Sequence, residues 1–324
     1  MSESLWPFVH YHLPLPWRES LFIREHHGAH KTGLLIESPS LTLNEPVKSI
    51  VLLEDAARIE CLVSGQHVRQ QLKLHGAPTP TVHVVPFFID ILGKRWACSV
   101  ESWLPGIELE HFHGDMWKAQ HIDKMAHQVA DLVKLSTRAL GTLNSKGWGS
   151  HLYGRPPKFN DVFGFERMVC TLAQEKGEPY RSWGFRCLSW LDAMKHKMIQ
   201  VPRCVMIWDV LDRNILWEGS HLTGVIDQDD ILTGDIWIVP AWSNVLLAHI
   251  DCPWTDMYMQ AWLKRWNMDD STYERFLWHR AFAGFYMSLR QNQYDNHGRS
   301  KSKISWDQAK QWLDEVASLV TKHK

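Results

Sequence analysis

Residues 204–235 of this 324-residue chain read CVMIWDVLDRNILWEGSHLTGVIDQDDILTGD, and this stretch decides the prediction of fold and chemistry. It begins with a short apolar strand, after which Asp209 and Asn214 follow at a spacing of five residues. Two more short strands, joined by the turn sequence Glu218-Gly219-Ser220, lead to Asp227. Because the returning strand of a hairpin ends beside the start of its partner, we expect Asp227 to lie next to Asn214.

Three oxygen-bearing side chains around one point suit phosphoryl transfer. That reaction needs a carboxylate that takes the proton of the acceptor hydroxyl, and oxygen ligands that hold magnesium against the phosphates. Asp209 is the candidate base, and Asn214 and Asp227 are the candidate magnesium ligands. The alternative is a structural turn, because Asp and Asn side chains commonly bond to nearby backbone. Taken alone, the spacing from Asp209 to Asn214 is more typical of such a turn.

The order of these residues resembles the signature of the aminoglycoside phosphotransferase-like branch of the protein-kinase-like fold, which includes antibiotic and choline kinases. That signature reads H-x-D-x-x-x-x-N, then a strand ending in [IV]-I-D, then G-D. The chain has W-D-V-L-D-R-N from Trp208, G-V-I-D ending at Asp227, and then Gly234-Asp235. The resemblance implies that Asp209 is the catalytic base and that Asn214 and Asp227 bind Mg²⁺, with ATP or GTP as the phosphoryl donor. It makes Asp235 a supporting carboxylate.

Two segments extend the resemblance towards the N-terminus. The sequence HGAPTP at 75–80 looks like the G-x-P-x-P segment that follows the helix of the nucleotide lobe in this family. The sequence VESWLPG at 100–106 looks like the family's hinge, where backbone groups meet the adenine. The resemblance therefore places Glu101, Ser102 and Trp103 in the nucleotide site.

The chain departs from the family pattern in three places. Trp208 stands near the position of the histidine that braces the catalytic loop. The strand at 50–53 has leucine where a basic residue often contacts the phosphates, so Lys48 at its start is the candidate cation. Glu60 on the following helix is the candidate ion-pair partner of Lys48, the alternative being a solvated helix glutamate. The phosphate-covering loop is expected near 24–33, where glycines are few.

The pattern of elements predicts an α+β, bilobal protein-kinase-like fold with a small β-rich N-lobe and a larger, mainly helical C-lobe. Short apolar runs and turn signals, with one helix near 55–75, precede the turn at Pro105-Gly106. Helical periodicity then dominates, with only a small cluster of strands around the quoted stretch. We predict a nucleotide-binding lobe at 1–103 and a catalytic and acceptor-binding lobe at 104–324.

The expected acceptor site is acidic. Residues 209–274 contain twelve Asp and Glu against three Lys and Arg. Acidic walls attract cationic ligands, and Asp229 and Asp230 directly follow the candidate metal ligand, so we assign them to acceptor binding. Tryptophan faces also bind cations and sugars, and four lie in this stretch: Trp237, Trp242, Trp254 and Trp262. For Trp242 and Trp262 the alternative is a helix core face. We expect a cationic hydroxylated acceptor such as an aminoglycoside, another amino sugar or an amino alcohol.

The composition limits the classes of partner that we expect the protein to bind. A net charge of −1 and a pI of about 7.0 argue against a nucleic-acid or membrane-surface binder. No apolar run approaches the roughly 20 residues of a membrane helix, and the N-terminus does not resemble a signal peptide. Six cysteines without a C-x-x-C pair or zinc spacing favour a reducing compartment, the cytoplasm. The expected partners are a nucleoside triphosphate and a small-molecule acceptor, with no nucleic acid and no membrane.

Two other classes of function were weighed against the kinase hypothesis. A protein of this fold could serve as a binding or regulatory module or run another nucleotide-dependent reaction, which the altered N-lobe and Trp208 favour. Retention of Asp209, Asn214 and Asp227 argues against such a loss of chemistry. A hydrolase or metalloenzyme has little support, because the sequence has no G-x-S-x-G and no HExxH motif.

Overall fold

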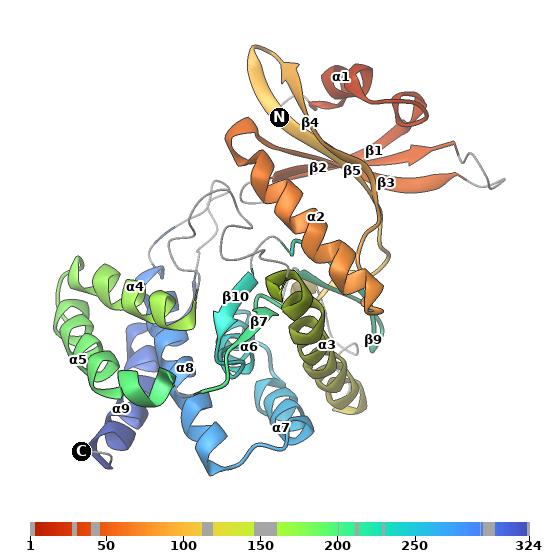
Figure 1. Ribbon diagram of the computed structural model, residues 1–324. Coiled ribbons are helices and arrows are strands. Elements are labelled where there is room, and N and C mark those ends of the chain that lie inside the picture. Colours follow the sequence, from red (N-terminus) through yellow and green to blue (C-terminus); the bar gives the residue numbers. More distant parts are fainter. Residues whose placement is uncertain are drawn as a thin grey trace.

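The computed structural model places a small lobe, built on a β-sheet, beside a larger helical lobe (Figure 1). The residues that it describes are 4–27, 31–39, 46–111, 119–145, 161–199, 201–210, 214–228, 231–291, 293 and 302–322. No helix within these segments is long and apolar enough to cross a membrane. The arrangement confirms the predicted α+β, two-lobed fold.

The small lobe contains one antiparallel sheet of five strands in the order β1-β2-β3-β5-β4. Its strands are β1 (Leu21–His27), β2 (Lys31–Ser38), β3 (Val47–Asp55), β4 (Val82–Ile91) and β5 (Lys94–Ser102). Strand β3 lies in the middle, where its run of Ile, Val and Leu residues suits burial on both faces.

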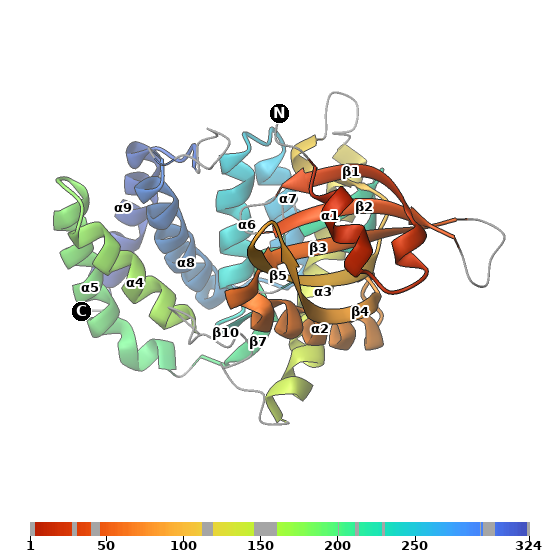
Figure 2. The same cartoon turned by 90° about the horizontal axis from the view of Figure 1, so that it is seen from above.

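One face of this sheet forms a separate hydrophobic core. Its members alternate along β2, β3 and β5 as the pleat requires: Leu34, Ile36, Val51, Leu53, Cys98 and Val100. Helix α1 (Trp6–Val9) and the 3-10 turns η1 (His10–His12) and η2 (Trp17–Glu19) supply Val9 and Leu13 to this core. In Figure 2 these N-terminal turns lie over the sheet.

Helix α2 (Ile59–Leu74) packs on the opposite side of the sheet from α1 (Figure 1). It follows the 3-10 turn η3 (Ala56–Arg58), which the Asp55 carboxylate caps by accepting from the Ala57 N–H at 2.9 Å. Its Val68 and Leu72 are fully buried, and they belong to the core of the large lobe, where α2 packs on α3. Helix α2 is therefore shared by the two lobes.

The large lobe is mainly helical. Its helices are α3 (Ala119–Ser145), α4 (Val162–Gln174), α5 (Tyr180–Ile199), α6 (Ile238–His249), α7 (Thr255–Arg265), α8 (Asp270–Leu289) and α9 (Trp306–Lys322). Helix α8 packs against α6, α9 and α4, and its largely apolar sequence fits this central position.

Short strands lie between the two lobes. Strands β7 (Cys204–Ile207) and β10 (Ile231–Gly234) form one antiparallel pair. Strands β6 (Ile107–Glu108), β8 (Ile215–Glu218) and β9 (His221–Val225) form a three-stranded sheet, and the turn η4 (Leu109–His111) follows β6. The predicted strands of the quoted stretch are confirmed to within a residue or two, whereas β6 and β10 were not predicted.

A glycine fixes the connection between the lobes. Gly106 has φ +120°, a conformation that side-chain-bearing residues rarely adopt. A Cβ at this position would also collide with the Thr223 side chain and lie 3.0 Å from the Trp217 backbone nitrogen. The Thr223 hydroxyl donates to the Pro105 carbonyl at 2.7 Å, which ties the inter-lobe segment to β9.

Candidate active site

Asp209 lies two residues beyond the end of β7. The register of β7 and β10 pairs Ile207 with Ile231, so Asp209 follows the end of β7 at which β10 begins. The Asp209 side chain is half-buried. The loop after β7 carries Asp209 close to Asn214, which precedes β8.

Asn214 is joined to Asp209 by a hydrogen bond. Its side-chain Nδ2 donates to the Asp209 main-chain carbonyl at 3.1 Å. Because the amide nitrogen is held in this way, the side-chain oxygen is the Asn214 atom that can ligate a cation.

Asp227 lies beside Asn214, as the hairpin geometry predicted. The Ile226 N–H donates to the Asn214 carbonyl at 2.9 Å, directly after the pairing of Ile215 with Val225. Asp227 has φ +56°, in the left-handed region that Asp tolerates better than most residues. Its carboxylate is 56% exposed. The structure thus gathers Asp209, Asn214 and Asp227, while their catalytic and metal-binding roles remain predictions.

A lysine that the sequence interpretation did not single out reaches this cluster. Lys31, the first residue of β2, places its Nζ 2.6 Å from Asp227 Oδ1. Desolvation by the surrounding protein would alone raise the pKa of the Asp227 carboxyl. The Lys31 charge and hydrogen bond, with smaller contributions from Arg69 and Arg58, outweigh desolvation and hold that pKa below its usual value. The position of Lys31 within the expected phosphate-covering loop was the signal that could have identified it.

Aromatic rings support Asp209 from the large lobe. The Trp242 indole N–H donates to Asp209 Oδ1 over a long 3.5 Å, and the Trp242 ring lies 4.7 Å from that of Trp208. Phe165 packs edge-on against both tryptophans. Trp242 and Trp262 are buried, so their assignment to helix core faces is correct, but Trp242 also contacts the candidate base.

The structure does not bring Lys48 and Glu60 together. Both side chains are exposed, and no ion pair joins them within the described residues. Lys48 lies at the start of β3, whereas Glu60 follows the far end of that strand. Eight residues of β3 from Lys48 to Asp55 span more than 20 Å, which a lysine side chain cannot bridge. The proposed Lys48–Glu60 pair is wrong for this reason.

Several polar groups of the predicted hinge residues form hydrogen bonds to other residues of the small lobe. The Ser102 and Trp103 N–H groups donate to the Thr81 and Lys48 carbonyls at 2.8 and 3.1 Å. The Glu101 carboxylate accepts from Arg69 of α2 at 2.6 Å, and both side chains are buried. These N–H groups and this carboxylate are therefore engaged within the protein, and the assignment of Glu101, Ser102 and Trp103 to the nucleotide site stays a prediction.

Two predicted acceptor-binding residues, Asp229 and Asp230, lie outside the described residues. The same holds for residues 28–30 of the expected phosphate-covering loop. Their assignment stays a prediction.

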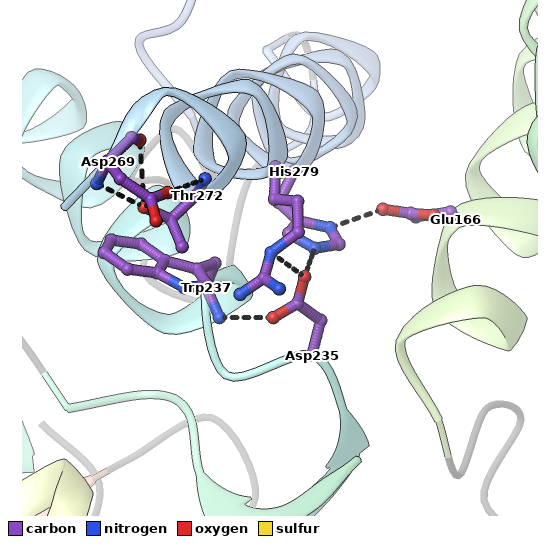
Figure 3. A network of polar contacts seen from close by, with 7 residues as sticks. Glu166, Asp235, Trp237, Asp269, Thr272 and His279 are labelled. Carbon is purple, nitrogen blue, oxygen red and sulfur yellow. Dashed lines mark hydrogen bonds and ion pairs between the residues drawn. The ribbon is translucent and has the colours of Figure 1, made fainter. Parts of the chain in front are cut away.

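Asp235 is the centre of a buried polar network (Figure 3). One oxygen accepts from the Trp237 N–H at 3.1 Å, and the other lies 3.1 Å from His279 Nε2 and from Arg275 Nε. The second ring nitrogen of His279 lies 2.7 Å from Glu166 Oε1. The network joins α4, α8 and the segment between β10 and α6, so Asp235 supports the large lobe rather than the reacting groups.

His279 is held in its charged form. Burial alone would lower the pKa of this fully buried imidazole, but its hydrogen bonds to Asp235 and Glu166 and their negative charges raise it to about 9. The pKa of Asp235 is lowered in spite of its burial by the same contact and by Arg275.

The oxygen donors of the site fit magnesium. The Asn214 amide oxygen and the Asp227 carboxylate are hard ligands of the kind that Mg²⁺ takes, usually one or two from the protein with water and phosphate completing the shell. The ammonium of Lys31 on Asp227 shows that a cation is accommodated at this carboxylate. Asn214 and Asp227 are therefore the residues that would hold the metal.

Comparisons with known proteins identify the fold. No family model matches the sequence, and no curated protein is similar to it. Among solved structures, the complex of APH(2")-IIia with GDP and kanamycin superposes with a TM-score of 0.61 at 12% identity, over 98% of each chain. Apo macrolide 2'-phosphotransferase MphH from Brachybacterium faecium gives a TM-score of 0.53 at 13% identity, over 81% of this chain and 83% of that one.

A third solved structure binds a triphosphate analogue. A thermostable mutant of aminoglycoside phosphotransferase APH(4)-Ia, in ternary complex with AMP-PNP and hygromycin B, gives a TM-score of 0.52 at 12% identity over 94% and 93% of the two chains. The protein therefore has the protein-kinase-like fold of the aminoglycoside phosphotransferases. This confirms the predicted fold class and the resemblance on which it rested.

Proposed function

We propose that the protein transfers the terminal phosphoryl group of ATP or GTP to a hydroxyl group of a small molecule, with Mg²⁺. The observation that carries the proposal is the clustering of Asp209, Asn214 and Asp227. Asn214 bonds to the Asp209 carbonyl, the Ile226 N–H next to Asp227 bonds to the Asn214 carbonyl, and Asp227 pairs with Lys31 of the small lobe. That this set occurs in a fold shared with antibiotic phosphotransferases supports the same class of reaction.

In this mechanism Asp209 orients the acceptor hydroxyl and takes its proton. The Trp242 indole N–H holds one Asp209 oxygen and thereby turns the other towards the acceptor. Asn214 keeps the loop in place through the Asp209 carbonyl and, with Asp227, would hold the metal. Bound magnesium would neutralise charge on the phosphates and fix their orientation.

For the acceptor we propose a cationic hydroxylated compound, an aminoglycoside or another amino sugar. The acidic stretch from 209 to 274 and the position of Asp229 and Asp230 support this class. Kanamycin and hygromycin B are bound by two proteins of the same fold. We further propose a nucleotide lobe at 1–103 and an acceptor lobe at 104–324. We also propose a cytoplasmic location, since the cysteines at 98, 170, 187, 204 and 252 are free thiols.

Calorimetric titration tests the nucleotide site. ATP and GTP, each with Mg²⁺, are titrated into the wild type, Asp227→Ala and the matched control Asp256→Ala, which removes an exposed carboxylate from α7. We expect magnesium-dependent binding in the wild type and the control and its loss in Asp227→Ala. An acceptor screen that begins with amino sugars then follows phosphate transfer by mass spectrometry.

A second candidate function is a binding or regulatory module of kinase fold. The use of the Ser102 and Trp103 N–H groups inside the lobe favours it, because those donors would otherwise meet the base of the nucleotide. If the wild type binds neither ATP nor GTP in the titration, this second function replaces the first.

A further inference from the structure

One face of the sheet looks towards α2 and the large lobe, and the strand register shows which side chains share it. Lys31 of β2 pairs with Glu54 of β3, which pairs in turn with Ala97 of β5. The opposite face is the closed apolar core under α1. Groups that contact a nucleotide between the lobes must therefore come from the Lys31–Glu54 face.

Strand β3 offers no cation at the Asp227 end of this face. The residues that share the face with Lys31 are Leu52 and Glu54 near that end and Ile50 further back. Lys48 lies on the same face, but six residues of strand separate it from Glu54, a span of about 20 Å. A phosphate group bound next to Asp227 is out of reach of Lys48.

The two arginines nearby are held by buried carboxylates. Arg69 lies 2.6 Å from Glu101, and Arg58 lies 3.0 Å from Glu54, whose side chain is fully buried. Removing either arginine would leave a buried negative charge uncompensated, so both are needed where they are. The cation of Lys31 instead faces a carboxylate that is more than half exposed.

We propose that Lys31 is the phosphate-binding cation of this protein, and that it exchanges Asp227 for the terminal phosphates when a magnesium nucleotide binds. The inference rests on the proposed function. Asp227 cannot hold both an ammonium at 2.6 Å and a divalent cation without strong repulsion between the two positive charges. The phosphates that arrive with the metal give the ammonium a new partner of higher charge within the same reach.

The exchange has two consequences of opposite direction. Without Lys31, a nucleotide loses a charge-assisted contact to its phosphates. Without Lys31, however, Asp227 also loses the cation that competes with a metal ion for its oxygen. Lys31→Met should therefore weaken nucleotide binding and tighten the binding of a divalent cation alone. A lysine that only pairs with Asp227 would produce the second effect without the first.

The test uses the full-length wild type, Lys31→Met, Lys31→Arg and the matched control Lys94→Met. Lys94 also pairs with an aspartate of the small lobe, Asp55, at 3.5 Å, but both side chains are half exposed and away from Asp227. Thermal unfolding first verifies that each variant is folded. Calorimetric titration then measures the affinity for the preferred nucleotide with Mg²⁺ and the affinity for its nucleoside. Electron paramagnetic resonance measures the binding of Mn²⁺ without nucleotide.

For Lys31→Met we expect nucleotide affinity to fall by roughly 10- to 100-fold, the effect of losing a hydrogen bond between charged groups. Nucleoside affinity should stay within twofold, Mn²⁺ should bind more tightly than to the wild type, and Lys31→Arg should recover part of the nucleotide affinity. Lys94→Met should match the wild type in all three measurements.

The inference is overturned if Lys31→Met binds nucleotide within twofold of the wild type, if the nucleoside loses as much affinity as the nucleotide, or if Mn²⁺ binding does not tighten. Those results leave the proposed function standing when the wild type binds nucleotide. A wild type that binds no nucleotide overturns the proposed function and the role of Lys31 in phosphate binding together.

Discussion

At the scale of single residues, Trp208 stands where the signature that the sequence resembles has a histidine. Trp208 cannot bridge two polar groups as histidine does, because it has one donor and no acceptor. Its ring instead packs 4.7 Å from the Trp242 ring, and Trp242 supplies the N–H that reaches Asp209. The contact is long, and under the proposed function it would tighten when the acceptor binds.

Replacing Trp242 with Phe should therefore slow turnover with little effect on nucleotide binding. Loss of one hydrogen bond to a charged group, partly replaced by water, corresponds to about a tenfold fall in kcat. Trp262→Phe controls for the lost volume, because the buried Trp262 indole nitrogen has no partner within the described residues. Equal losses of kcat in the two variants would contradict a specific role for Trp242.

Asp209→Asn should remove the base while keeping the size of the side chain. We expect phosphoryl transfer to fall roughly 100- to 10,000-fold, the usual contribution of general base catalysis, with nucleotide affinity nearly unchanged. Steady-state kinetics and calorimetry measure the two quantities. Asp256→Asn, an exposed residue of α7, is the matched control. Retained turnover in Asp209→Asn would assign the base to another residue.

The limits of sequence prediction are also visible at this scale. The spacing of Asp209, Asn214 and Asp227 predicted their meeting, because a strand, a turn and a hairpin determine it locally. Lys31 lies 196 residues from its partner Asp227, so the approach of the two depends on how the lobes pack and leaves no local pattern. The Trp242 contact with Asp209 is equally non-local.

At the scale of elements, the buried charges hold helices to their neighbours. The charged form of His279 joins α8 to Glu166 of α4 and to Asp235. Its pKa is raised from 6.5 to about 9. The stabilisation is therefore fully present below about pH 6.5 and is lost as the pH rises through about 9. The difference corresponds to about 3 kcal/mol.

We accordingly expect the unfolding temperature of the wild type to fall between pH 7 and 9.5. His279→Gln should unfold at a lower temperature at pH 6.5 and lose most of this dependence on pH. Differential scanning calorimetry across the range measures both. A wild type and a variant with parallel pH profiles would show that His279 does not titrate in this window.

The Arg69–Glu101 pair joins α2 to β5 in the same manner. Because both side chains are buried, Glu101→Leu should leave an unpaired buried charge and cost about 3 to 5 kcal/mol of unfolding free energy. The double variant Arg69→Met, Glu101→Leu should recover much of that loss. Denaturant unfolding of the two single variants and the double variant provides the cycle, and strictly additive losses would contradict the coupling.

Sequence patterns predicted the helices and strands better than they predicted which groups each side chain contacts. The helix predicted near 55–75, for example, is α2 at Ile59–Leu74. The pairing of Arg69 with Glu101 was missed because the residue type at position 101 does not show whether its side chain contacts a nucleotide or a helix. Only the packing of α2 on the sheet distinguishes the two.

At the scale of the whole molecule, the two cores are separate but not independent. Helix α2 lies in the predicted nucleotide lobe, and yet Val68 and Leu72 are part of the core of the large lobe. Leu72→Ala should therefore destabilise the whole protein by about 2 to 5 kcal/mol. Calorimetry should show one cooperative transition that shifts as a unit. Two transitions, with only one of them shifted, would contradict shared folding of the lobes.

The shared helix also has a consequence for the chain during its synthesis. The five strands of the sheet are complete once Ser102 has been added, but Val68 and Leu72 find their apolar partners only when α3, which ends at Ser145, has followed. At roughly 5–20 residues per second, this interval lasts about 2 to 9 seconds. During this interval the apolar face of α2 is exposed on the nascent chain. We therefore expect a chaperone that binds exposed apolar segments to bind the chain at this stage of synthesis.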